Sequence, residues 1–240
     1  MKAVVLAAGK GVRLRPLTNN VPKVMVKAKG RPMLEHALSR LAEAGIGGFE
    51  IVVGYRSDAI AAHFGNEFAG VPINYITQDE QLGTAHAVAL AEGNVEGDFI
   101  VTNGDVIVES ALYARMISGK KDALSDDGFD ALVAGRRVDD PWRYGVLVHE
   151  GAALKDIIEK PAYGKQTGNV INAGIYRFNG KIFPAIRETR ESERSEYEIV
   201  DSIKIMMQSG GKAGVLIYEG ACLDIGDAED LKRANESAWL

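Results

Sequence analysis

A glycine-rich loop near the N-terminus is the first stretch of the chain whose residue types could do chemistry. Gly9 and Gly11 follow the apolar run 3–8, which predicts a buried parallel strand that ends at the edge of a sheet. Glycine lets backbone N–H groups approach a polyanion without a Cβ atom in the way. The same stretch carries four cationic side chains: Lys10, Arg13, Arg15 and Lys23. Amide donors beside positive charge favour a triphosphate as the ligand.

Two better-known glycine loops do not fit this stretch. A dinucleotide fingerprint needs a third glycine at the position of Leu14 and an acidic residue about twenty positions further on, and both are missing. This argues against a nicotinamide-dependent oxidoreductase. Pro16 also disfavours a helix that starts directly after Gly11. A Walker loop cannot be aligned here. For the glycines taken alone, an ordinary turn between a strand and a helix, with solvated basic residues, explains the pattern equally well.

The first half of the chain alternates between strand and helix patterns. Apolar runs predict strands at 3–8, 49–54, 71–77 and 98–102. Helical spacing or composition predicts helices at 31–44, 57–65 and 84–91. This alternation predicts an α/β fold with a mostly parallel sheet flanked by helices.

The pattern changes after about residue 106. Residues 119–130 are charged and flanked by glycine, which predicts a mobile surface loop. The alternating charges of residues 187–198 predict a solvated helix or loop. Short strands with less helix between them are predicted at 131–136, 145–149, 154–159 and 170–178. We therefore expect a smaller mixed α+β lobe that lies over the first sheet.

Composition excludes several classes of protein. A chain of 240 residues provides one large α/β domain or two small ones. Its net charge of −5 argues against a nucleic-acid partner, which would require a basic field. The only cysteine, Cys222, rules out an internal disulfide and fits a reducing compartment. No apolar run is long enough to span a membrane, and 3–8 is too short for the core of a signal peptide. The expected location is cytoplasmic.

Two aspartates that each follow a predicted strand are candidates for a metal site. Asp105 ends the segment Asn103-Gly104-Asp105, and Asp224 follows the predicted strand 213–218. Ligands of open parallel sheets bind beyond the carboxyl ends of the strands, and Mg²⁺ commonly takes one or two protein carboxylates plus substrate phosphates. Taken singly, each aspartate is more typical of a turn or a helix cap. The four histidines form no zinc-ligand spacing and are expected in core or surface roles: His36, His63, His86 and His149.

The segment from Leu6 to Thr18, together with Pro22-Lys23, resembles the signature of the sugar-1-phosphate nucleotidylyltransferases, or nucleotide-sugar pyrophosphorylases. The resemblance implies a Rossmann-like, GT-A-like domain that joins a nucleoside triphosphate to a sugar 1-phosphate and releases pyrophosphate. Residues 1–240 are then one nucleotidyltransferase domain. Its nucleotide-binding half is 1–110, and its sugar-binding half, which also carries the C-terminal metal aspartate, is 111–240. No hexapeptide pattern of the left-handed β-helix found in many relatives is present.

The resemblance also implies roles for individual residues. Arg13 and Lys23 neutralise charge on the α-phosphate and the leaving group, while Asp105 and Asp224 hold Mg²⁺ between the substrates. Lys160 binds the phosphate of the sugar. The implied nucleotide-binding residues are Leu6, Ala8, Gly9, Gly11, Gln78, Gly83 and Thr84. The implied sugar-phosphate-binding residues are Gly145, Glu159, Lys160 and Asn172.

The implied base-reading residue favours a pyrimidine. A glutamine amide such as that of Gln78 can accept from N3–H and donate to a carbonyl of uracil or thymine, whereas a carboxylate would suit the paired donors of guanine. UTP or dTTP is therefore expected in preference to GTP. Glu196 has a match near the sugar pocket in the family, but its charged surroundings favour a solvated helix. Val12, Cys222 and Asp227 depart from the residues that are frequent in relatives.

The expected function is transfer of a nucleotidyl group from UTP or dTTP to a hexose 1-phosphate, with glucose 1-phosphate or N-acetylglucosamine 1-phosphate favoured. Use of CTP, GTP or another alcohol phosphate stays open. So does a catalytically silent regulatory subunit, although Lys23, Asp105 and Asp224 are all present and argue against it. The sequence does not select the sugar, and a homo-oligomer is compatible with it. Whether the chain is whole or the catalytic part of a longer protein is also open.

Overall fold

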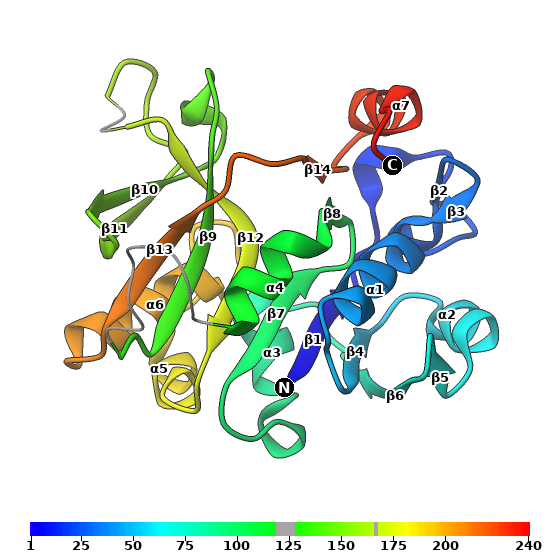
Figure 1. Ribbon diagram of the computed structural model, residues 1–240, viewed down its shortest axis with the longest axis horizontal. Helices are drawn as coiled ribbons and strands as arrows, with labels where there is room; N and C mark the ends of the chain where they lie inside the picture. Colours follow the sequence, from blue (N-terminus) through cyan, green and yellow to red (C-terminus); the bar gives the residue numbers. More distant parts are fainter. Residues whose placement is uncertain (119–127, 166–167) are drawn as a thin grey trace.

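One large sheet runs through the whole molecule (Figure 1). The computed structural model describes residues 1–118, 128–165 and 168–240. Most of the predicted loop at 119–130 therefore lies outside the described residues. The ten strands of the sheet, in spatial order, are β10 (Gly145–Glu150), β11 (Ala153–Glu159), β13 (Ala213–Ile217), β9 (Ala131–Arg137), β12 (Val170–Phe178), β7 (Phe99–Asn103), β1 (Lys2–Ala7), β4 (Phe49–Val53), β6 (Val71–Thr77) and β5 (Glu67–Phe68).

The part of the sheet formed by the first half of the chain has a parallel core, as predicted. β1 pairs in parallel with β4 and β7, and β4 pairs in parallel with β6. The apolar sequence of β1 is buried on both faces, which explains why it lies between two parallel neighbours. The carboxyl ends of these strands consequently meet at one edge of the sheet, where loops can bring ligand-binding groups together.

The second half of the chain is mixed, as predicted, but its strands join the edge of the parallel sheet instead of lying over it. β12 pairs antiparallel with both β7 and β9, and β9 pairs in parallel with β13. β10 also pairs with β12 through Val146 and Ile171, so the far end of the sheet curls back on itself. This continuity gives the second half a fixed position relative to the loops that follow β1 and β7.

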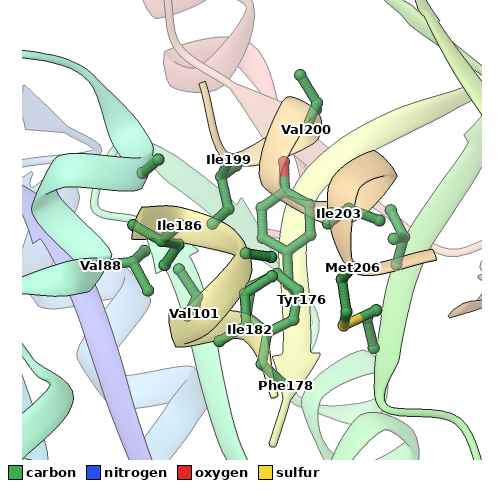
Figure 2. Packing of buried hydrophobic residues seen from close by; sticks show 14 of the residues in the cluster. Val88, Val101, Tyr176, Phe178, Ile182, Ile186, Ile199, Val200, Ile203 and Met206 are labelled. Atoms are coloured by element: carbon green, nitrogen blue, oxygen red, sulfur yellow. The ribbon is translucent and has the colours of Figure 1, made fainter. Parts of the chain in front are cut away.

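Helices cover both faces of the sheet. They are α1 (Met33–Glu43), α2 (Ser57–Phe64), α3 (Thr84–Ala89), α4 (Ser110–Ser118), α5 (Ile182–Glu188), α6 (Ile199–Gln208) and α7 (Ala228–Glu236). One core cluster contains side chains of α3, α5 and α6, and a second contains side chains of α1, α2 and α4. Figure 2 shows α5 and α6 packing Ile182, Ile203 and Met206 around Tyr176 and Phe178 of β12. The second half therefore holds more helix than the sequence indicated. None of the helices in the described ranges combines the length and apolarity needed to cross a membrane.

A short ribbon returns the C-terminal region to the carboxyl edge of the sheet. β8 (Val106–Val108) follows β7 directly and pairs antiparallel with β14 (Cys222–Asp224), with Asp224 opposite Val106. Beyond the ribbon, α7 lies beside β2 (Lys27–Ala28), which pairs with β3 (Arg31–Pro32) (Figure 1). Leu14, Ile107 and Ile225 belong to a small apolar cluster that packs the N-terminal loop against this C-terminal segment. Segments distant in sequence therefore meet at one place.

Helix α7 begins with a capping box that fixes the chain just after Asp224. The Asp227 carboxylate accepts hydrogen bonds from the backbone N–H groups of Glu229 and Asp230, both at 3.0 Å, and Asp230 accepts from the N–H of Asp227 at 3.1 Å. Asp227→Ala is expected to lower the free energy of unfolding by about 1 kcal/mol, measured by urea denaturation at neutral pH. Asp227→Asn keeps an acceptor at this position and should retain most of the stability.

The same cap has a defined pH dependence. The hydrogen bonds from Asp230 and Glu229 hold the pKa of Asp227 below its ordinary value. A lowered pKa in the folded state means that the stabilisation is present above the unfolded pKa of about 3.9 and is lost as pH falls through the folded value. The stability difference between the wild type and Asp227→Ala should therefore shrink in acid. Equal urea midpoints at neutral pH would show that the cap contributes nothing.

Candidate active site

A cavity of about 380 Å³ opens at the carboxyl edge of the parallel strands. It is lined by Leu6, Ala8, Gly9, Gly11, Val12, Arg13, Lys23, Val24, Gln78, Gln81, Gly83, Thr84, Ala87, Asn103, Asp105, Glu196 and Gly226. All seven residues predicted to bind nucleotide are among them, together with Arg13, Lys23 and Asp105. The loops after β1, β6 and β7 thus contribute to one concave surface, as expected at the edge of an open α/β sheet.

The glycine loop presents bare backbone to this cavity. No heavy atom lies within 4 Å of the place where a Cβ of Gly9 would stand, so the peptide there is open to a ligand. Gly11 has φ +63, and a Cβ atom on it would lie 2.7 Å from Cβ of Lys23. The Thr18 hydroxyl donates to the Gly11 carbonyl at 2.7 Å and fixes the turn. Of the four cations predicted for this loop, Lys10 and Arg15 are exposed outside the cavity lining.

The two candidate metal ligands come together, as the β8–β14 ribbon requires. The Ile225 N–H donates to the Asp105 carbonyl at 3.2 Å, and the Asp105 carboxylate forms an ion pair with Lys23. Desolvation and the negative charge of Asp105 raise the pKa of Asp224 to about 6, while Lys23 opposes the shift. Because Asp224 is exposed to solvent, desolvation matters less than the burial of its surroundings suggests. Repulsion between the two carboxylates is therefore the cause of the raised pKa that matters for a metal site. Lys23 pairs with Asp105 and carries a single positive charge, so it neutralises only part of the negative charge of the two carboxylates.

This donor set fits a magnesium ion held partly by substrate. Carboxylate oxygens are the ligands that Mg²⁺ takes, usually one or two of them with phosphate oxygens and water completing the shell. Within the described part of the chain, no group of three or more His, Cys, Asp and Glu side chains could hold a metal on its own. Asp105 and Asp224 would therefore supply the protein oxygens, and the remaining ligands would come from phosphates in the cavity.

The base-reading segment is fixed by contacts with a distant loop. Gln78 is 3% exposed, and its Nε2 lies 3.3 Å from the Gly83 carbonyl and 3.0 Å from Nδ1 of His86. The Ala85 N–H donates to the Tyr197 carbonyl at 2.8 Å, and the Tyr197 N–H donates to the Leu82 carbonyl at 2.7 Å. Backbone hydrogen bonds therefore join the loop that precedes α6 to residues 82–85, where α3 begins.

The predicted sugar-binding residues form a second group on β10, β11 and β12. Gly145 pairs with Glu159, and a Cβ on Gly145 would lie 2.8 Å from the Glu159 carboxylate and 3.8 Å from Cβ of Asn172. The Asn172 amide donates to the Tyr176 hydroxyl at 2.7 Å. The Lys160 N–H donates to the Tyr144 carbonyl at 3.0 Å, and its side chain is exposed. Gly145, Glu159 and Asn172 therefore lie together, with Lys160 adjacent in the chain.

Two contacts link β11 and β12 with segments that contribute to the nucleotide cavity. A Cβ on Gly174, which has φ +72, would lie 2.9 Å from the side-chain nitrogen of Asn103 in the cavity wall. Arg194 lies 3.6 Å from the Glu159 carboxylate and 2.9 Å from that of Glu198. β12 is thus within side-chain reach of Asn103, at the start of the loop that carries Asp105.

Sequence reasoning missed the loop of residues 194–198. Glu196 lines the nucleotide cavity from a loop, whereas a solvated helix was expected. Glu198 is 9% exposed, and burial raises the pKa of its carboxyl group above the ordinary value although Arg194 opposes this. The apolar spacing of Ile199, Ile203 and Met206 could have located the start of α6, and with it a loop that ends at the sheet.

The histidines divide as expected except for one. His36 is buried against the Ala28 carbonyl at 2.8 Å, His63 lies 3.2 Å from Glu35 on the surface, and His149 bonds its own turn at Gly151. These are the core and surface roles that the sequence indicated. His86 differs because its ring contacts Gln78 beside the cavity.

Comparisons with known proteins match nearly the whole chain. The Nucleotidyl transferase family model matches residues 2–238. The UTP–glucose-1-phosphate uridylyltransferase AglF of Haloferax volcanii is 38% identical over 237 residues, covering 98% of this chain and 96% of that protein. The bifunctional protein GlmU of Methanococcus maripaludis is 35% identical over 236 residues, which are 98% of this chain and 54% of GlmU. Among solved structures, a UTP-bound UGPase from Acinetobacter baumannii matches with a TM-score of 0.84 at 26% identity, covering 98% of this chain and 92% of that one.

Proposed function

The chain belongs to the nucleotidyl transferase family, and on that premise we propose that it transfers a nucleotidyl group from UTP or dTTP to a hexose 1-phosphate. Glucose 1-phosphate and N-acetylglucosamine 1-phosphate are the favoured acceptors in this proposal. A relative at 38% identity, named as a UTP–glucose-1-phosphate uridylyltransferase, supports the first of them. The observation that carries the proposal is the convergence of the glycine loop, Gln78 and Asp105 on one cavity.

In this proposal the two halves of the chain have different tasks. Residues 1–110 bind the nucleotide, and 111–240 bind the sugar 1-phosphate, with Glu196 and Gly226 reaching across to line the nucleotide cavity. The base lies at Gln78 and Gly83, and the triphosphate lies along Gly9 and Gly11. Glu159 and Asn172 accept and donate hydrogen bonds to sugar hydroxyl groups, and Lys160 binds the sugar phosphate.

The reaction is a displacement at phosphorus. An oxygen of the sugar phosphate attacks the α-phosphorus of the nucleotide, the bond from that phosphorus to the bridging oxygen breaks, and pyrophosphate leaves with the bonding electron pair. Arg13 and Lys23, both in the cavity wall, neutralise charge on the α-phosphate and on the leaving pyrophosphate. No general base is needed, since a phosphate dianion is already a nucleophile near neutral pH. Asp105 and Asp224 would hold Mg²⁺, which would supply further charge neutralisation at the reacting phosphates.

The direct test is a pyrophosphate-release assay in which each nucleoside triphosphate is combined with a panel of sugar 1-phosphates. UTP or dTTP with glucose 1-phosphate or N-acetylglucosamine 1-phosphate should give Mg²⁺-dependent pyrophosphate and an equal amount of the nucleotide sugar. Turnover only with CTP or GTP would move the proposal to another base. Failure of every combination in folded protein, judged by a cooperative thermal transition, would favour a catalytically silent subunit.

The base-reading role of Gln78 is tested by Gln78→Glu. A carboxylate at this buried position would face the Gly83 carbonyl, and its loss of the amide N–H groups would break both hydrogen bonds that fix the side chain. We expect kcat/KM for UTP to fall about tenfold, mainly through KM, because one buried polar contact becomes repulsive. Steady-state kinetics at saturating sugar phosphate measure this. An unchanged preference among the four triphosphates would remove Gln78 from the base site.

A further inference from the structure

The side-chain amide of Gln78 is held in one orientation by two acceptors. Its Nε2 lies 3.3 Å from the Gly83 carbonyl oxygen and 3.0 Å from Nδ1 of His86. A carbonyl oxygen only accepts hydrogen bonds, so the end of the amide that faces Gly83 must be the NH₂ group. The second N–H of that group then points at His86. Nδ1 of His86 must therefore accept, which places the ring proton on Nε2.

This arrangement leaves Oε1 of Gln78 as the group available to a ligand. Both N–H bonds of the amide are committed, so Gln78 can offer only an acceptor. Among the described residues, no side-chain oxygen or nitrogen of Gln78 is both buried and without a hydrogen-bond partner. Oε1 of Gln78 accepts no hydrogen bond from those residues, so it must be open to solvent. Because Gln78 lines the cavity, a ligand in the cavity can reach this oxygen. A glutamine that only accepts a hydrogen bond from the base differs from the sequence-based expectation, in which the amide both accepts and donates.

A complementary donor lies next to this acceptor. Within the ranges that the structure describes, the backbone N–H of Gly83 makes no hydrogen bond, and Gly83 lines the same cavity. An imide base presents an N3–H donor flanked by carbonyl acceptors, which matches one acceptor and one donor in the wall. Cytosine presents a bare N3 acceptor in the same place, which would face the lone pairs of Gln78 Oε1.

We propose that His86 is a positioning residue that locks Gln78 as an acceptor and thereby makes the cavity select an imide base, uracil or thymine, over cytosine. The inference rests on the proposed function only in taking this cavity as the nucleotide site. His86 is needed because the Gly83 carbonyl already accepts the Ala87 N–H at 3.1 Å and holds only one side of the amide. Without the ring acceptor, the amide gains a free N–H that can turn toward cytosine N3.

The test compares binding of UTP and CTP, with Mg²⁺ present and sugar phosphate absent, by isothermal titration calorimetry. The wild type should bind UTP at least about tenfold more tightly than CTP, since the wrong base leaves buried polar groups unpaired. His86→Leu and His86→Phe both remove the acceptor and should reduce that ratio to within about threefold. His86→Asn places an amide oxygen near the Nδ1 position and should retain the preference. His149→Leu, which removes a histidine bonded to a backbone carbonyl outside the cavity, is the matched control.

Steady-state kinetics separate positioning from catalysis. Where turnover is measurable, His86→Phe should raise KM for UTP and leave kcat within about twofold, because it touches neither phosphate nor metal ligands. Retention of the UTP preference by both His86→Leu and His86→Phe would overturn the inference. Equal loss in His86→Asn, or no preference in the wild type, would overturn it too. Selective UTP binding without any turnover would overturn the proposed function alone.

Discussion

Asp105→Asn and Asp224→Asn are each expected to lower kcat by about 10²- to 10³-fold, because each would remove one charged oxygen ligand from the proposed metal site. Asparagine keeps the size of the side chain but loses its negative charge. The pair then attracts a divalent cation less strongly, so the Mg²⁺ concentration that gives half-maximal rate should rise. Pyrophosphate release measured across a Mg²⁺ titration reports both quantities.

The control for these variants is Asp79→Asn, one residue beyond Gln78. Asp79 is exposed and outside the cavity lining, so its replacement should change kcat by less than about twofold. Asp105→Asn also relieves the repulsion that raises the pKa of Asp224, and the variant should stay folded. Addition of UTP with Mg²⁺ should raise the thermal midpoint of the wild type more than that of either variant. Full Mg²⁺-dependent turnover in both would show that the metal binds elsewhere.

The parallel part of the sheet could be predicted because its information is local. A strand buried on both faces needs a continuous apolar run. β4 and β7 are buried along almost their whole length, and their bounds lie within one residue of those that such runs indicated. The glycine loop could be located for the same reason, since Gly9 and Gly11 follow β1 directly. The role of each half as a nucleotide-binding or sugar-binding unit stays a prediction.

The meeting of Asp105 and Asp224 could not be derived from local pattern. β8 and β14 have three residues each, too few for a periodic signal, and they are brought together only by their pairing across the sheet edge. The resemblance to a known family implied that the two aspartates act together, but it did not predict these two strands. A search for turn residues alone would have assigned each aspartate to a cap or a turn.

The loop that precedes α6 shows a different limit. Its dense charges are typical of a solvated surface, yet Glu198 is buried because Arg194 supplies a counter-charge and the Tyr197 backbone bonds to the segment before α3. Burial of a charged residue depends on partners that are distant in sequence, and a local pattern carries no record of them. His86 was assigned a core or surface role for the same reason.

Gly83→Ala should be the most destabilising single change in the nucleotide cavity. Gly83 has φ +110, which L side chains rarely adopt, and a Cβ atom there would lie 2.5 Å from the carbonyl oxygen and 2.7 Å from the nitrogen of Tyr197. Those atoms are backbone and are held by hydrogen bonds to Leu82 and Ala85, so they cannot turn aside as a flexible side chain would. We expect a loss of about 2–4 kcal/mol in the free energy of unfolding, from strain and overpacking together.

The same change should weaken UTP binding by about tenfold or more, since separating the two loops moves the Gly83 N–H and the acceptors that orient Gln78. Urea denaturation and UTP titration measure the two effects. Gly180→Ala is the matched control, because no heavy atom lies within 4 Å of its Cβ position and its φ is outside the left-handed range. That variant should stay within about 0.5 kcal/mol of the wild type. A Gly83→Ala protein with wild-type stability and UTP affinity would mean that the junction between these loops does not hold the base-reading segment in place.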